Sequence, residues 1–418
     1  MNKKKLSRSG SLQSSVTSVL AALLCIVIGL LVGFLVLVAI NPAHAWGDGF
    51  VRIIKGGFHD APYGVGKELA NAAPLIMTGL SVAFAFKTGL FNIGAAGQYT
   101  LGAYGALYCA IMLKLPWFVC LLAAAVLGGL WGAIPGFFKA YFNINEVITS
   151  IMFNWIGLYL VNELIYQNGT GPMYDVRNTR TLNLGKNADF AQSIIPDFGL
   201  NKLFQTNSTT IAIFLAAVVA VLVWVVLNKT TFGYELKAVG LNKSAARYAG
   251  INEKKNIILS MAIAGALAGA GAALYWLGGN TEFYWNTYQA LPGVGFNGIP
   301  VALLAVNNPI AVIFTGIFMA MLDIVGLQLT NLTAYNEYIT DVIISVIVYL
   351  SAFSLLIQMM LTGRKKKLVV EANKTTTADI PAEAETQPLD VPPEDIPDIP
   401  MEEAPQVLEQ PEEGGEQA

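Results

Sequence analysis

The chain has 418 residues, of which 55% are hydrophobic and only 13% carry a charged side chain. Soluble domains carry roughly 25% charged residues, and several apolar runs here reach the ~20 residues that cross a bilayer. The composition therefore excludes an ordinary soluble domain and predicts an all-α, polytopic membrane protein. The net charge of −3 is unevenly spread, because 24 of 25 basic residues but only 14 of 28 acidic residues precede Glu371. The part before Glu371 has a net charge of +10, which is expected to face the cytoplasm and gives no sign of nucleic-acid binding.

The first apolar run is Val16–Ile40, and it follows a basic stretch that contains Lys3 and Arg8. Ala43-His44-Ala45 resembles a signal-peptidase site, but the apolar part of a signal peptide has only ~7–15 residues. We therefore expect a retained first span after a cytoplasmic N-terminus of residues 1–15. The mixed segment Asn41–Lys67 is expected to lie on the outer membrane surface.

Hydropathy divides the rest of the chain into further spans, one of which, beginning at Pro292, is short and rich in glycine. A transmembrane domain of about ten helices, residues 16–361, places both termini and every basic cluster on the cytoplasmic side. The expected spans after the first are 69–86, 92–113, 116–138, 146–166, 209–227, 257–277, 292–307, 310–329 and 339–361. Residues 362–418 begin with a basic cluster and continue as an acidic, proline-rich stretch that is expected to be disordered.

The most polar inward-facing loop is 229–255, which lies between two strongly apolar runs. Asn242 can cap a short helix and Gly250 can end it, so Lys243 and Arg247 would share one face. The loop is either a solvated turn that only fixes orientation or a docking helix for a separate protein. The residues assigned to that docking helix are Glu235, Leu241, Asn242, Lys243, Arg247 and Tyr248.

A short sequence echo suggests an internal repeat. Phe91-Asn-Ile-Gly94 opens the third span, and Phe296-Asn-Gly-Ile299 recurs in the eighth, which runs in the opposite direction. This predicts an inverted repeat of spans two to five against spans seven to ten, with substrate at the interface of the two halves.

Polar side chains inside the membrane are expensive and are therefore functional candidates. Each of them could instead form a hydrogen bond between helices that only holds the bundle together, and aromatic residues could simply face lipid. The candidate substrate path consists of Phe91, Asn92, Gln98, Glu146, Asn154, Phe296, Asn297 and Asp323.

The chain offers no catalytic or metal-binding pattern. Cys25, Cys109 and Cys120 lie in apolar runs without a CxxC neighbour, and two histidines are too few for a metal cluster. No phosphate-binding GxxxxGK[ST] loop occurs. We expect no catalytic residues, no cofactor, no metal and no hydrolysis of ATP by this chain.

Four ordered motifs resemble a known family. They are Ala73-Pro-Leu-Ile-Met-Thr-Gly-Leu80, Gly89-Leu-Phe-Asn-Ile-Gly-Ala-Ala-Gly-Gln98, Asn145-Glu-Val-Ile-Thr-Ser-Ile-Met-Phe-Asn154 and Ala238-Val-Gly-Leu-Asn-Lys-Ser-Ala-Ala-Arg-Tyr-Ala-Gly-Ile251. They are similar to the permease subunits of ABC importers for simple sugars, branched-chain amino acids and nucleosides, and most similar to the nucleoside (guanosine-type) branch. The resemblance covers about Leu69–Ser351.

This resemblance implies a second permease subunit, two cytoplasmic ATP-binding subunits and an extracellular substrate-binding lipoprotein. The loop around Asn242 would be the coupling helix, seated in a groove of the ATP-binding subunit. A permease for sugars or branched-chain amino acids is the alternative within the family. A secondary transporter driven by an ion gradient, which would use Asp323 and Glu146, is the alternative outside it, and a membrane scaffold acting through the acidic tail is a weaker one.

Overall fold

The computed structural model describes residues 3–283, 290–332, 335 and 338–353, and the expected acidic tail lies outside these residues. The long helices are α1 (Lys3–Ile40), α3 (Tyr63–Lys87), α4 (Ala95–Ile111), α5 (Trp117–Phe142), α6 (Glu146–Tyr166), α8 (Ala212–Lys229), α9 (Thr231–Leu241), α11 (Glu253–Trp276), α12 (Gly293–Leu304), α13 (Pro309–Leu332) and α14 (Tyr338–Ala352). The short elements are η1 (Ala45–Val51), α2 (Arg52–Lys55), η2 (Gly56–Asp60), η3 (Gln167–Gly169), β1 (Tyr174–Asp175), β2 (Arg180–Thr181), η4 (Ala188–Ser193), α7 (Leu200–Phe204) and α10 (Lys243–Tyr248).

The all-α, polytopic class is confirmed. Within the described residues, seven helices are long and apolar enough to cross a membrane. The helix α12 has only 12 residues and rises about 18 Å, against a hydrocarbon core of roughly 30 Å. The expected third span begins as a helix only at Ala95, because the preceding residues are unwound. The total of ten spans therefore stays a prediction.

The most extensive contact between two helices of the described residues is that between α5 and α11. On α5, large apolar residues four positions apart are exposed, as a lipid-facing stripe requires: Phe118, Leu122, Val126 and Leu130. The opposite face carries Gly128 and Gly132, which lie against the backbone of α11 at Gly265 and Gly269. Because lipid gives no hydrophobic drive for helix association, such close backbone contact supplies the packing energy.

The packing pairs of the two halves correspond. The pair α5–α11 has its counterpart in α13–α3, the pair α4–α11 in α12–α3, and the pair α4–α6 in α12–α14. These correspondences are what an inverted repeat of α3–α6 and α11–α14 requires, and they support that prediction.

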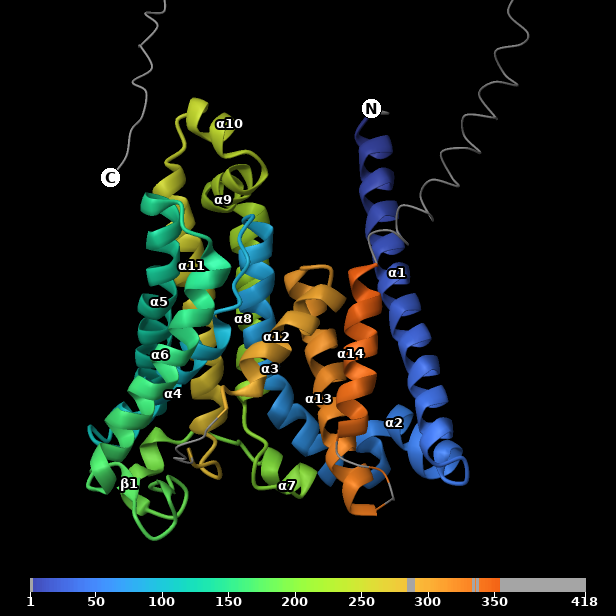
Figure 1. Ribbon diagram of the computed structural model, residues 1–418, viewed down its shortest axis with the longest axis vertical. Coiled ribbons are helices and arrows are strands. Elements are labelled where there is room, and N and C mark those ends of the chain that lie inside the picture. Colours follow the sequence, from blue (N-terminus) through green and yellow to red (C-terminus); the bar gives the residue numbers. More distant parts are fainter. Residues whose placement is uncertain (1–2, 284–289, 333–334, 336–337, 354–418) are drawn as a thin grey trace, which may run out of the picture. The chain divides into compact units, whose positions relative to one another are not determined.

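Polar elements gather at the two ends of the helices. In Figure 1, α9 and α10 lie at one end of α11, and β1 and α7 lie near the other. The segment before α3, expected on the membrane surface, exposes Trp46, Ile54 and Phe58. Ile53, which was expected to belong to the same surface, is instead buried, because one face of the short helix α2 packs inward.

Gly269→Ala tests the contact between α5 and α11. A Cβ at this position would collide with the carbonyl oxygen of Ala124, and neither backbone can move aside cheaply. Overpacking of this kind costs about 1–3 kcal/mol, so we expect a loss of that size in the free energy of unfolding, measured by SDS titration in mixed micelles. Gly47→Ala is the matched control, because nothing lies within 4 Å of a Cβ there. Equal stability of the two variants would contradict this account of the packing.

Candidate functional site

The unwound join between α3 and α4 is held by Asn92, whose side chain is fully buried. Its amide nitrogen donates to Ser81 Oγ at 2.9 Å and to Gln98 Oε1 at 2.8 Å. Its Oδ1 accepts from the Gly94 amide at 3.1 Å and from Gln98 Nε2 at 3.0 Å. All four hydrogen-bonding positions of this amide are therefore occupied within the protein.

Asn154 of α6 completes the support of the join. Its Oδ1 accepts from the Gly97 amide at 2.8 Å, and its Nδ2 donates to the Ile93 carbonyl at 3.0 Å. A buried backbone outside a regular helix is tolerated only where its polar groups find such partners. Asn92, Gln98 and Asn154 thus form one network, which we call the join network. Its hydrogen bonds between helices explain why these three positions carry polar side chains.

The other candidates of the predicted path divide into two groups. Phe296 and Asn297 lie half-buried on α12, next to Gly295, which contacts the backbone of Ala96 at the start of α4. The start of α12, just before the second copy of the echo, therefore lies beside the start of α4, just after the first copy. Phe91 packs against the Phe86 ring with centroids 5.0 Å apart.

Glu146 and Asp323 do not belong to this group. Glu146 begins α6 and forms a 2.8 Å ion pair with Lys139 of α5, at the turn between the two helices. Asp323 lies half-buried on α13. The structure thus gathers Asn92, Gln98 and Asn154 in one place and leaves these two acids outside it.

The loop expected to dock a partner is a rigid helical hairpin, α9–α10. The side chain of Asn242 accepts from the Ala245 amide at 3.0 Å, and Gly250 follows α10 with a φ of +80°, so the predicted helix and its two ends are confirmed. Ala246 is the buried residue of α10, whereas Leu241 is 88% and Tyr248 94% exposed. Lys243 and Arg247 are exposed on the same short helix. Glu235 differs from the other docking candidates, since it accepts from Asn256 Nδ2 of α11 at 3.5 Å.

The hairpin rests directly on the join between α3 and α4. Gly89 has a φ of +74°, and a Cβ there would collide with the backbone of Gly240 in α9. Ala246 shares a buried apolar cluster with Leu90 of the join and Ile257 of α11. Any displacement of α10 must therefore reach the segment that the join network holds.

Sequence reasoning missed several residues of this region. Thr88 and Ser260 face each other through their hydroxyl groups and tie the join to α11. Tyr99 and Ser150 are buried, and their hydroxyl groups have no hydrogen-bond partner among the described residues. A single hydroxyl in an apolar run gives no sequence signal, because only helix packing decides whether it is paired.

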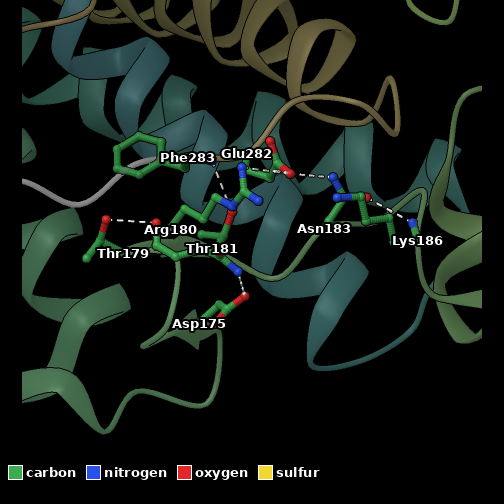
Figure 2. A network of polar contacts seen from close by, with 9 residues as sticks. Asp175, Thr179, Arg180, Thr181, Asn183, Lys186, Glu282 and Phe283 are labelled. Atoms are coloured by element: carbon green, nitrogen blue, oxygen red, sulfur yellow. Dashed lines mark hydrogen bonds and ion pairs between the residues drawn. The ribbon is translucent and has the colours of Figure 1, made fainter.

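A polar network at the opposite end of α11 joins the loop after α6 to the residues after α11 (Figure 2). Arg180 of β2 pairs with Glu282 at 3.4 Å, and Asn183 donates to the same carboxylate. At the tip of this loop, the side-chain amide of Asn178 donates to Asp175 at 2.7 Å and lowers the pKa of that carboxyl below its ordinary value.

Comparison with known proteins agrees with this geometry. Residues 66–352 match the family described as the permease component of the branched-chain amino acid transport system. The chain belongs to this permease family. It is 34% identical to the guanosine ABC transporter permease protein NupP of Bacillus subtilis, over 83% of this chain and 97% of that protein. No solved structure matches the chain.

Two further relatives widen the comparison. The nucleoside ABC transporter permease protein NupB of Lactococcus lactis is 32% identical over 85% of this chain and 96% of that protein. The glucose ABC transporter permease protein TsgB13 of Haloferax volcanii is 33% identical over 72% of this chain and 79% of that protein. Family membership means that the permease is embedded in a membrane and works with ATP-binding subunits, which hydrolyse the ATP, and with a substrate-binding protein.

Asn154→Ala tests the join network. The change leaves the Gly97 amide and the Ile93 carbonyl without their partner, and an unsatisfied buried group costs about 1–3 kcal/mol. We expect a loss of that size in the free energy of unfolding, together with faster hydrogen exchange in the peptide that contains Gly97. Asn228→Ala is the control, because Asn228 is exposed on α8 and bonds only within its own helix. Unchanged exchange at Gly97 would show that Asn154 does not support the join.

Proposed function

We propose that this chain is one permease subunit of an ATP-driven importer that moves nucleosides into the cell. The observation that carries the proposal is the hairpin α9–α10, which is capped, rigid and seated on the α3–α4 join, yet exposes Leu241 and Tyr248 beside two basic residues. Exposed apolar residues surrounded by polar residues mark a protein interaction site, and a helix that binds in a groove of its partner is a common mode of docking. The names of the nucleoside and guanosine permeases among the relatives support the substrate class.

The proposed topology follows from charge. The basic loop 229–255, the N-terminal residues 1–15 and the tail 362–418 would lie in the cytoplasm, within a plasma membrane, by the positive-inside rule. The partners would be two ATP-binding subunits beneath α10, a second permease subunit, and a substrate-binding lipoprotein on the outer side. The transmembrane domain would extend over residues 16–361.

In the proposed mechanism, closure of the ATP-binding subunits displaces α10. The displacement would pass through the Gly240–Gly89 contact and the cluster around Ala246 into the α3–α4 join. Movement of the join would reposition Asn92 and its partners relative to α12. This chain's own residues therefore transmit force and shape the path, and they break no covalent bond.

The substrate path is proposed to run along the contact of α4, α6 and α12. The eight residues predicted from the sequence stay candidates, although Asn92 and Asn154 would act by positioning backbone rather than by direct contact. Glu146, paired with Lys139, and Asp323 of α13 lie outside the join network. Tyr99 and Ser150 are added to the eight candidates, because their buried hydroxyl groups are free to bond a passing polar ligand, as far as the described residues show. A sugar is the second candidate substrate, since the glucose permease relative is 33% identical.

Uptake of tritiated guanosine by cells that express the complete transporter tests the proposed function. We expect uptake to stop when the phosphate-binding lysine of the ATP-binding subunit is replaced, and to continue when an ionophore dissipates ion gradients while ATP stays high. Uptake that follows the ion gradient instead would identify a secondary transporter. Glucose uptake without guanosine uptake would select the sugar alternative.

Arg247→Glu tests the docking role of α10. Replacement of a basic contact at the centre of an interface typically costs about 2 kcal/mol or more, which is roughly a 30-fold loss of affinity. We expect such a loss in the binding of the ATP-binding subunit to the purified permease, measured by interferometry. Lys202→Glu is the matched control, because Lys202 is exposed on α7 at the other end of the helices. Full affinity in the Arg247 variant would refute docking at α10.

A further inference from the structure

The loop between α6 and α8 lies at one end of α5 and α11 and is attached at two places. One attachment is to the α4–α5 turn, where Lys114 and Asp189 form an exposed 2.7 Å ion pair and Ser193 Oγ donates to the Leu115 carbonyl at 2.6 Å. The other attachment is to the end of α11, where the Ile195 amide donates to the Leu277 carbonyl at 3.0 Å. The loop therefore cannot move without engaging α5, α11 or both.

The attachment to α11 contains a buried charge. Glu282 is only 9% exposed. Its carboxylate forms an ion pair with Arg180 and accepts a hydrogen bond from the side-chain amide of Asn183 (Figure 2). Next to it, the Thr181 amide donates to the Phe283 carbonyl at 2.9 Å, and the Phe283 amide donates to Thr181 Oγ1 at 3.0 Å. We call these five residues the outer clamp. Removal of one partner of a buried carboxylate strongly destabilises the fold. The intact pairing therefore favours the observed arrangement of the clamp.

The outer clamp is joined to α11 by direct ring packing. The Phe283 ring lies 5.3 Å from the ring of Trp276, the last residue of α11. From there α11 runs 24 residues, about 36 Å, to its other end. At that end Ile257 lies beneath Ala246 of α10, and Asn256 contacts Glu235 of α9.

The middle of α11 is packed tightly against α5. The backbones of Gly265 and Gly269 lie in close contact with the backbone of α5, which restrains bending and sliding of α11. A tightly packed core of this kind is not continuously deformable and transmits strain. A force applied at the outer clamp is therefore delivered to the hairpin α9–α10, and the reverse is also true.

We infer that the outer clamp is the positioning element that conveys docking of the substrate-binding protein to α11, and through α11 to the ATP-binding subunits. The inference rests on the proposed function and adds a specific route to it. The exposed tip of the same loop carries Val176, 65% exposed, and Arg177, and it is braced by Asp175, whose Oδ1 accepts from the Arg177 amide at 3.0 Å. Contact at this tip would pull on β2, which contributes Arg180 to the clamp.

The test compares ATP hydrolysis by the complete transporter in proteoliposomes with and without the substrate-binding protein loaded with guanosine. We expect Glu282→Gln to lower the stimulated rate by about fivefold, the lower end of typical allosteric coupling, and to leave the basal rate unchanged. Arg180→Gln should have the same effect. The double variant should be no worse than either single variant, because both changes remove one interaction.

The control is Asp189→Asn, which removes the other ion pair of the same loop. That pair is more than half exposed on both sides, and exposed pairs contribute little, so stimulation should stay at the wild-type level. Basal and stimulated rates that fall in proportion in the Glu282 variant would indicate a merely structural role and overturn the inference. Full stimulation in that variant would overturn it as well, while the proposed function would stand. Absence of stimulation in the wild-type transporter would overturn the proposed function and the inference together.

Discussion

The rest of this structure depends on one constraint, the need to satisfy buried backbone that is not helical. The chain leaves the helical conformation between α3 and α4, where Thr88, Leu90 and Asn92 are buried and water offers no partner for a free amide or carbonyl. The side chain of Asn92 accepts from the Gly94 amide, and Asn154 of α6 bonds the Gly97 amide and the Ile93 carbonyl. Ser81 of α3 and Gln98 of α4 in turn hold the side chain of Asn92. The join is therefore fixed by side chains of three different helices as well as by its own local backbone turns.

This constraint links the join to the hairpin α9–α10. The join carries Gly89 and Leu90, which form the seat of the hairpin α9–α10. The hairpin also rests on α11, whose glycines lock it to α5. In the proposed mechanism, a partner bound at α10 acts on the join through the Gly240–Gly89 contact and on α11 through packing.

The polar residues within the membrane have a role that differs from the simplest expectation for a transporter. Asn92 uses all its hydrogen-bonding capacity on the protein, and Glu146 is paired with Lys139 at a helix turn. Among the described residues, the buried hydroxyls of Tyr99 and Ser150 have no hydrogen-bond partner, and α12 has a half-buried face. The proposed path, with few charged groups along it, suits an uncharged, polar substrate, because no buried ion has to be neutralised.

The sequence by itself determined the class, the family and the short helix Lys243–Tyr248 with its cap. Apolar runs, charge distribution and four motifs are local properties, and the capping of α10 by Asn242 depends only on residues a few positions away. Only the tertiary structure decided which intramembrane polar groups are paired, and that Glu282 pairs with Arg180 from a loop 102 positions earlier. These outcomes depend on how distant helices approach one another, and a hydrogen bond between distant residues leaves no periodicity in the chain.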